Sequence, residues 1–435
     1  MSRFMGEDAV VIGAGIAGLS AAMAVSGFFR NVTLVERDAT EPSDDPRAGV
    51  PQGRHPHVLT SGALRALEEL FPGLSQALTE AGALPLSAGW DIRQEVPGVG
   101  ALPQRRIPCP TFAATRPVLE RVLSQSLKAQ TNVTIRRGVA ALGISTAPDG
   151  SRATGVRVED EDGEVKDIKA DLVVDASGRI GLIARALEAI GRPMPRGEAI
   201  GIGIGYTTGV FRIPSDAEPD FGILVTWADP PHNGRSGYLV KIADNVWQVL
   251  MVGRGGDQPP ADIDGFYDFA RTLATSSISD ALKKACPPQK LTRFRFPEST
   301  RWRFGAGSAP AGLLPIGDSL CRFNPIYGQG MAVAAQEAVL LRELLQSCAS
   351  RATDGLSWLA DEFPSRCDAL VEAPWMTSAV PDFAYPVTTG ARPQDFDERI
   401  RAQGELLQNA FHDEAAHRTL LEVQNLLPRG FLALA

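Results

Sequence analysis

A glycine-rich stretch near the N-terminus, VVIGAGIAGLSAA, limits the possible folds more than any other part of the chain. Gly13, Gly15 and Gly18 form the pattern G-x-G-x-x-G between an apolar run, AVVIG, and a helical pattern, LSAAMAVS. A second apolar run, NVTLVER, follows. The first glycine permits a tight turn, the second lets the backbone approach a pyrophosphate, and the third lets the helix pack on the strand. The order predicts half of a dinucleotide-binding βαβ unit, with a glycine turn that binds nothing as the structural alternative.

The end of the second apolar run narrows the choice of dinucleotide. Glu36 stands where an acidic side chain accepts hydrogen bonds from an adenosine ribose, and its charge disfavours the 2′-phosphate of NADP. FAD and NAD therefore fit better than NADP, and the stretch alone leaves both open. The residues that we expect to hold the dinucleotide here are Gly13, Gly15, Ile16, Ala17, Gly18, Glu36 and Arg37.

Composition excludes several other classes of protein. The 435 residues are enough for two or three domains, and a net charge of −8 gives no electrostatic footprint for nucleic acid or an anionic membrane. None of the five cysteines form C-x-x-C and no histidines have the spacing of H-E-x-x-H, which argues against a disulfide framework and a catalytic metal. With no signal peptide and no apolar run of membrane-spanning length, we expect a cytoplasmic protein without an integral membrane segment.

The middle and the end of the chain have different patterns. Residues from about 200 to 252 alternate in strand fashion, as in an antiparallel sheet with one covered face, and the last ninety or so residues carry helical patterns. Between them a second glycine loop, NPIYGQGM, precedes the helical run MAVAAQEAVLLRELL. Its N–H groups at a helix N-terminus predict a second anion site, with a plain helix-starting turn as the alternative.

Several later motifs together resemble those of flavoprotein monooxygenases. They are RAGV with Arg47, TRPVLERVL with Arg116, DLVVDASGR with Asp175, and LLPIGDSL with Asp318. The resemblance implies that Asp318 binds the ribityl chain of FAD and that Arg47 and Arg116 lie along the pyrophosphate and flavin. Val139 joins the expected cofactor-binding residues on the same ground.

The fold that this resemblance implies is α/β, of the p-hydroxybenzoate-hydroxylase class. A Rossmann-type FAD domain is interrupted by a mainly antiparallel β-sheet substrate domain and followed by a C-terminal helical region. The expected ranges are 1–75, 100–195 and 290–345 for the discontinuous FAD-binding domain, 76–99 and 196–289 for the substrate domain, and 346–435 for the helical region.

The subgroup that the chain resembles most in its motifs is the FAD-dependent epoxidases of polyether biosynthesis. The similarity runs through RAGVPQGRHPHVL, ALRALEELFPGL, NPIYGQGM and DFAYPVTTGARP. It implies an FAD-dependent monooxygenase that uses a flavin C4a-hydroperoxide to epoxidise or hydroxylate a hydrophobic specialised metabolite. The halogenase motif W-x-W-x-I-P is absent, which makes halogenation a minor option. A flavin-dependent alkene reductase of the geranylgeranyl-reductase type and a non-catalytic FAD-binding redox protein are the alternatives.

The source of electrons stays open at this point. The middle motif reads DASGRIG and departs from the G-A-D-G form of the hydroxylases, where it helps to bind both FAD and NADPH. Either NAD(P)H reduces the flavin directly or a separate flavin reductase is a partner, and the other partners that we expect are the substrate and O2.

The loop NPIYGQGM would meet the charge that develops on reduced flavin. Backbone N–H groups at Gly328, Gly330 and Met331 would stabilise that charge, while Pro325 would face the flavin without acting as an acid or a base. The candidates for the wall of the substrate cavity are Tyr206, Phe211, Trp227, Trp247 and Met251, of which alternation turns about half away. His55 and His57 would lie near the flavin, where local packing is the simpler role for each.

Overall fold

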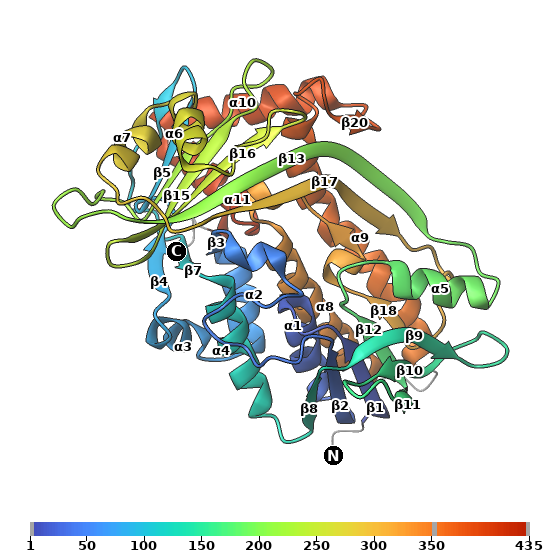
Figure 1. Cartoon of the computed structure of the whole chain (residues 1–435). Coiled ribbons are helices and arrows are strands. Elements are labelled where there is room, and N and C mark those ends of the chain that lie inside the picture. Colours follow the sequence, from blue (N-terminus) through green and yellow to red (C-terminus); the bar gives the residue numbers. More distant parts are fainter. Residues whose placement is uncertain (1–3, 350–354, 432–435) are drawn as a thin grey trace.

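Five parallel strands form the base of the molecule, and they come from widely separated parts of the chain (Figure 1). The computed structural model describes residues 4–349 and 355–431. The sheet has the order β18-β12-β1-β2-β8, with β1 Gly6–Ile12, β2 Phe29–Glu36, β8 Val133–Arg137, β12 Leu172–Asp175 and β18 Leu313–Pro315. Val10 and Val11 of β1 are both buried, because a parallel sheet is covered on its two faces.

Helices pack on this sheet from one side and a small antiparallel sheet contacts it from the other. Helix α1 (Ile16–Ser26) packs against α4 (Arg116–Lys128) and α8 (Gly330–Ala349). The small sheet consists of β9 Ala140–Thr146, β10 Ala153–Glu159 and β11 Val165–Lys169, and α5 Gly181–Ala189 lies beside it. The Rossmann-type α/β portion predicted from the sequence is therefore confirmed.

A larger, mainly antiparallel sheet lies above the helices in Figure 1. In spatial order it contains β19 Cys321–Arg322, β17 Leu291–Arg303, β13 Arg196–Arg212, β16 Val246–Arg254, β15 Ser236–Ala243, β14 Ile223–Thr226, β5 Ile92–Val96 and β6 Gly100–Ala101, and β20 Thr389–Gly390 pairs with β13. Only β5 and β14 run parallel among these described pairs. Strand β13 has 17 residues and crosses most of the width of the molecule.

The two faces of the large sheet contact different helices. Met251 packs with Phe266 in a cluster that includes α6 (Ile263–Arg271) and α7 (Ser277–Lys283). The neighbouring residues Leu250 and Val252 belong to a second cluster, which includes side chains of α8 and α9. This alternation follows from the two-residue period of a strand.

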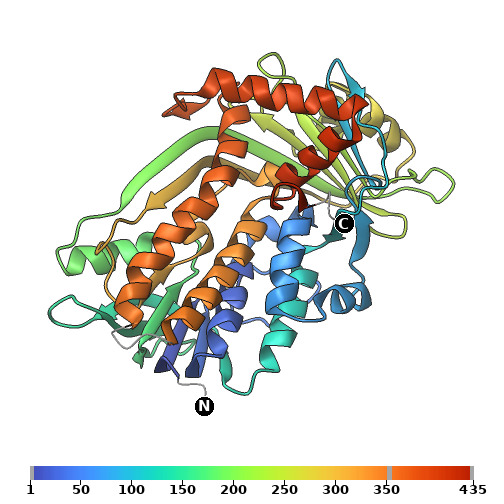
Figure 2. The ribbon, with the colours of Figure 1, turned by 180° about the vertical axis from the view of Figure 1, so that it is seen from behind.

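The C-terminal helices lie against the back of the molecule (Figure 2). They are α9 Gly355–Asp382, α10 Phe396–His412 and α11 Glu414–Gln424. Arg105 ties them to an earlier segment, since its guanidinium donates hydrogen bonds to the carbonyl oxygens of Ala410 and Phe411 at 2.6 and 3.0 Å. The C-terminal helical region expected from the sequence is thus present.

The remaining elements connect these layers. They are η1 Pro51–Arg54, β3 His57–Leu59, α2 Ser61–Leu70, α3 Leu74–Glu80, β4 Leu84–Ser87 and β7 Pro110–Ala114, with β7 between β3 and β4 in a three-stranded sheet. In the described ranges no helix has the length and hydropathy needed to cross a bilayer. We propose the domain division given above, with β17 leading from the large sheet back to the FAD-binding portion.

Candidate functional site

The first glycine loop has the geometry of a phosphate-binding turn. Gly13 has φ +97°, and a Cβ on it would lie 2.6 Å from the carbonyl oxygen of Ala176. A Cβ on Gly18 would lie 1.7 Å from the carbonyl oxygen of Gly13, so both positions require glycine. A Cβ on Gly15 would meet only Nη2 of Arg116, at 3.5 Å. The space in front of Gly15, at the N-terminus of α1, is therefore open to a ligand.

Glu36 supports this loop and keeps room for a further hydrogen bond. Its Oε2 accepts from the backbone N–H of Ala14 at 2.8 Å and lies 3.1 Å from Nη1 of Arg47, and its Oε1 accepts from Asp38 N–H at 3.0 Å. A carboxylate has about four acceptor positions, so one is left for a ribose hydroxyl. Val139 lies beside it and donates its N–H to the Glu36 carbonyl at 2.9 Å. Arg37 is exposed, and its Nη2 donates a hydrogen bond to the carbonyl of Gly49 at 3.4 Å.

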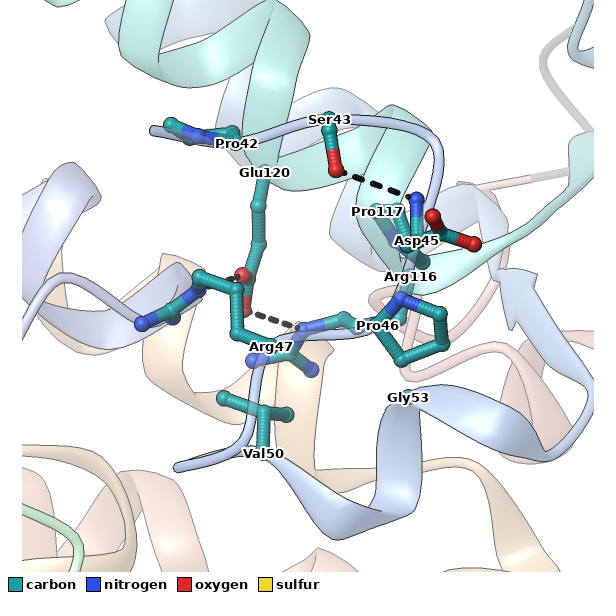
Figure 3. A pocket seen from close by; sticks show the side chains of 10 residues that line it. All are labelled: Pro42, Ser43, Asp45, Pro46, Arg47, Val50, Gly53, Arg116, Pro117 and Glu120. Atoms are coloured by element: carbon teal, nitrogen blue, oxygen red, sulfur yellow. Dashed lines mark hydrogen bonds and ion pairs between the residues drawn. The ribbon is translucent and has the colours of Figure 1, made fainter. Parts of the chain in front are cut away.

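A buried glutamate holds the two predicted arginines together. Glu120 accepts from Nε of Arg47 and from Nε of Arg116, each at 2.8 Å, as Figure 3 shows. Burial alone would raise the pKa of Glu120, but Arg116 and Arg47 outweigh it and lower that pKa. The cavity beside these side chains has a volume of about 10 Å³, which holds at most a water molecule. It is lined by Pro42, Ser43, Asp45, Pro46, Arg47, Val50, Gly53, Arg116, Pro117 and Glu120.

Asp318 lies where the second motif approaches the first. It is the middle residue of η2 (Gly317–Ser319), directly after β18. Gly317 has φ +63°, and a Cβ on it would lie 2.7 Å from Cβ of Ala17 in α1. Within the described ranges no group hydrogen-bonds the half-buried carboxylate of Asp318. Burial raises its pKa to about 6, and the charges of Arg322 and Arg116 oppose that rise. The carboxylate of Asp318 could therefore accept a hydrogen bond from a hydroxyl of the ribityl chain of FAD.

A second buried carboxyl fixes the turn that carries Asp318. Glu337 of α8 is fully buried, and its Oε2 accepts from the N–H of Gly317 at 2.7 Å. Its Oε1 has no hydrogen-bond partner among the described residues. Burial raises the pKa of Glu337 to about 8, so the group is neutral at pH 7. Sequence reasoning passed over Glu337, because one acidic residue in a helical run has no distinguishing pattern.

The loop NPIYGQGM begins α8 as expected, and a buried network holds it. Residues Pro325–Tyr327 form η3, Gly328 has φ +68°, and α8 begins at Gly330. Asn324 caps η3 by accepting from Ile326 N–H at 3.2 Å. Because α8 starts inside the loop, Met331 and its neighbours carry the free N–H groups of the helix N-terminus.

The centre of that network is Asp382, which sequence reasoning did not single out. Nδ2 of Asn324 donates to its two carboxylate oxygens at 2.9 and 3.0 Å, and the hydroxyl of Tyr327 donates at 3.1 Å. Nη1 of Arg254 lies 2.9 Å from the same carboxylate. Tyr238 adds a hydrogen bond from its hydroxyl to the Ile326 carbonyl at 3.2 Å. A possible signal in the sequence was the motif DFAYPVTTGARP, in which Asp382 is the first residue.

His55 faces the large sheet from the loop after η1. Its Nδ1 lies 2.7 Å from Oγ1 of Thr208, and its ring centroid lies 4.6 Å from that of Tyr206, edge-on. Its Nε2 is buried without a partner in the described chain. Burial and then the charge of Arg54 lower the pKa of His55 to about 4. Nδ1 of His57 lies 2.9 Å from the carbonyl oxygen of His55, and burial followed by the charge of Arg116 lowers the pKa of His57 to about 3.

The structure separates the predicted wall residues into groups. Tyr206 lies on the face that meets His55, with its ring centroid 5.2 Å from that of Phe294. Trp227 lies nearer the edge, where its Nε1 donates to Gln94 at 3.1 Å and its ring lies 6.3 Å from Tyr238.

Phe211, Trp247 and Met251 pack on the other face, with Phe266 and Phe269 of α6. These three side chains are fully buried there and therefore do not belong to the proposed cavity wall. The alternation of a strand puts them opposite Tyr206.

A larger cavity of about 480 Å³ lies elsewhere, between α2, α8, α9 and α11. None of the predicted cofactor or substrate residues line it. Among the residues of 4–349 and 355–431 no group of three or more histidines, cysteines and carboxylates is placed to hold a metal ion.

Known proteins resemble this chain in sequence or in fold. The family described as FAD binding domain matches residues 7–373. "Protein Rv3254" of Mycobacterium tuberculosis (strain ATCC 25618 / H37Rv) is 32% identical over 397 residues, which cover 87% of this chain and 81% of that protein.

Two solved structures have a similar fold at low sequence identity. The flavin-dependent brominase Bmp2 has a TM-score of 0.69 and 13% identity, covering 97% of this chain and 93% of that one. The Pseudomonas aeruginosa protein pqsL, described as a probable FAD-dependent monooxygenase, has a TM-score of 0.60 and 15% identity, covering 86% and 96%. At such low identities these two structures support the fold alone.

Proposed function

Because this chain belongs to the FAD binding domain family, we propose that it is an FAD-dependent monooxygenase. Its reaction would place one oxygen atom of O2 on a hydrophobic specialised metabolite, by epoxidation or hydroxylation, and reduce the other atom to water. The observation that carries the proposal is the position of Asp318. No group in the described part of the chain hydrogen-bonds its carboxylate, and the close approach of Gly317 to Ala17 puts it beside the glycine loop.

The residues that would hold FAD come from several segments of the chain, each facing a different part of the cofactor. The N–H groups at the start of α1 would bind the pyrophosphate, Glu36 and Val139 the adenosine, and Asp318 the ribityl chain. The loop residues Gly328, Gly330 and Met331 would meet the isoalloxazine ring. When bound, FAD supplies the oxygen-activating chemistry, which no side chain here provides.

The protein would contribute electrostatics and the exclusion of water. The N-terminus of α8 would stabilise negative charge on the flavin through its backbone N–H groups and the positive end of the helix dipole. Pro325 would face the ring and leave a space for oxygen and substrate. Tyr206 and Trp227 would close that space from the sheet side and keep water out. This arrangement suits an oxygen transfer that needs no acid or base from the protein.

The motif DASGRIG is the basis for the proposed source of electrons. We propose slow oxidation of NAD(P)H by the purified protein alone and faster oxidation when a flavin reductase is added. Rapid, substrate-stimulated NAD(P)H oxidation without a partner would show direct reduction instead. The cytoplasmic location stays a prediction, and halogenation stays the less favoured reaction because W-x-W-x-I-P is absent.

The test uses the FAD-loaded protein with NADH, a flavin reductase and ¹⁸O2. We expect purified protein with a flavin absorbance spectrum and a product that gains one ¹⁸O atom. A saturated product without consumption of O2 would instead indicate an alkene reductase. FAD binding without turnover of any candidate substrate would favour a redox protein, and a colourless protein that cannot be reconstituted with FAD would contradict all three.

A further inference from the structure

Arg322 is a half-buried arginine whose side chain has no polar partner among the described residues. It ends β19, the two-residue strand between Asp318 and the loop NPIYGQGM. Its guanidinium carbon lies 4.3 Å from the ring centroid of Phe296 in β17. Within residues 4–349 and 355–431, no carboxylate lies within ion-pair distance of Arg322 and no group hydrogen-bonds its side chain.

Three arginines are more deeply buried than Arg322, and all three are paired. Arg47 lies 3.0 Å from Asp38, Arg254 lies 2.9 Å from Asp382, and Arg301 lies 2.7 Å from Glu372. A guanidinium that leaves water usually keeps such a partner, because burying a charge alone is costly. Stacking on Phe296 orients Arg322 but uses none of its N–H donors. Those donors are therefore available to a ligand.

The ring under Arg322 belongs to the same face of the sheet as the candidate substrate wall. Phe294 and Phe296 are two positions apart in β17, so their side chains share a face. In the register of the sheet Phe294 pairs with Tyr206 and Phe296 with Ile204. Tyr206 in turn contacts His55. Arg322 thus lies beside a largely buried aromatic cluster, four residues after Asp318 and three before Pro325.

The charge of Arg322 acts on the pKa values of two groups in this region, Asp318 and Tyr206. It opposes burial in setting the pKa of Asp318, and it does the same for the pKa of Tyr206, which burial raises. The guanidinium therefore influences both the predicted ribityl ligand and the predicted cavity wall.

Resting on the proposed function, we propose that Arg322 recognises a carboxylate on an otherwise apolar substrate. The planar fork of a guanidinium matches the two oxygens of a carboxylate, and the neighbouring side chains of Phe294, Phe296 and Tyr206 make the surroundings of the guanidinium apolar. The phosphates of FAD are a less suitable partner, because Arg116 already lies at the glycine loop, with its Nη2 3.5 Å from the position of a Cβ on Gly15. The substrate class is then an amphipathic carboxylic acid rather than a neutral hydrocarbon.

The experiment measures binding of octanoate and of benzoate to FAD-loaded protein by calorimetry, with octanamide and benzamide as neutral counterparts. We expect Arg322→Gln to weaken carboxylate binding by about 10- to 100-fold, as for loss of a charged hydrogen bond, and to leave amide binding unchanged. Arg322→Lys should lie between, because it keeps the charge without the fork. The control is Arg295→Gln, which removes the same charge from an exposed position next to Phe296.

The outcomes are distinct from those of the oxygenation test. Carboxylate affinity that is equal in the native protein and in Arg322→Gln, including no binding by either, overturns the proposal. So does a variant that loses affinity for FAD while it keeps affinity for carboxylates. A protein that binds octanoate through Arg322 but incorporates no ¹⁸O contradicts the proposed function and leaves this inference standing. Unchanged thermal unfolding of Arg322→Gln would confirm that the variant is folded.

Discussion

The side-chain amide of Asn324 donates to both carboxylate oxygens of Asp382, at 2.9 and 3.0 Å, and so joins the loop before α8 to the end of α9. Asp382 is 1% exposed and also meets Arg254. We expect Asp382→Ala to lower the free energy of unfolding by about 3–5 kcal/mol, since it leaves a buried guanidinium unpaired. Denaturant titration measures the change.

The same substitution should loosen the predicted flavin loop. We expect FAD affinity to fall together with stability, because Asn324 and Tyr327 lose their common acceptor. The control is Asp244→Asn, at a side chain that is 97% exposed, which should change stability by less than about 0.5 kcal/mol. Full FAD affinity in folded Asp382→Ala would show that the network supports only α9.

A substitution at Gly15 separates folding from cofactor binding. A Cβ on Gly15 would meet only Arg116, at 3.5 Å, whereas a Cβ on Gly18 would collide with the backbone of Gly13. Gly15→Ala should therefore fold with nearly native stability and bind FAD at least about 10-fold more weakly, because its methyl group occupies the approach to the pyrophosphate. Gly18→Ala should lose stability as well. Fluorescence titration of FAD, beside thermal unfolding, distinguishes the two, and native affinity in Gly15→Ala would contradict the predicted position of the pyrophosphate.

Local patterns predicted the parts of the site that lie at strand ends. The order of strand, glycines and helix predicted the turn from Gly13 to Gly18, whereas Asp318 was expected from the resemblance to flavoprotein monooxygenases. The structure brings the two motifs together, since a Cβ on Gly317 would lie 2.7 Å from Cβ of Ala17.

The parts that sequence reasoning missed depend on contacts between distant segments. Asn324 and Asp382 are 58 positions apart, and α9 continues through the three internal prolines Pro364, Pro374 and Pro381. Alternation showed that Tyr206 and Phe211 belong to opposite faces. The alternation did not show which face contacts α6 and which contacts α8, because apolar side chains of helices cover both faces.

The two faces of the sheet should respond differently to mutation. Met251 is fully buried against α6, so Met251→Ala should cost roughly 2–4 kcal/mol of stability through the cavity it creates, with little change in FAD or substrate affinity. In the described residues no group hydrogen-bonds the hydroxyl of Tyr206. Tyr206→Phe should therefore keep native stability and alter the KM for substrate. A changed KM in folded Met251→Ala, with none in Tyr206→Phe, would reverse the assignment of the faces.

Glu337 should make the protein less stable at alkaline pH. Burial raises its pKa to about 8 in the folded state, well above the value of about 4.3 in an unfolded chain. Its stabilising contribution is complete below the unfolded value and is lost as pH rises through 8, because the unfolded chain releases the proton first. Glu337→Gln keeps the acceptor for Gly317 and should gain roughly 2–4 kcal/mol relative to native protein between pH 5 and 9. Glu343→Gln, at an exposed position of α8, is the control, and parallel pH profiles for all three proteins would contradict a buried neutral carboxyl.

His417 should have the opposite effect at acidic pH. It is 2% exposed, and Nη1 of Arg105 donates to its Nδ1 at 2.9 Å. Burial and then Arg105 lower its pKa to about 4, so its contribution is complete above the unfolded value of about 6.5 and is lost as pH falls toward 4. In His417→Asn, whose side-chain oxygen can still accept from Arg105, the loss of stability between pH 6.5 and 4 should be smaller by roughly 1–3 kcal/mol. His412→Asn removes an exposed histidine of the neighbouring helix and should follow the native profile; a native profile in His417→Asn as well would show that His417 takes up its proton without unfolding.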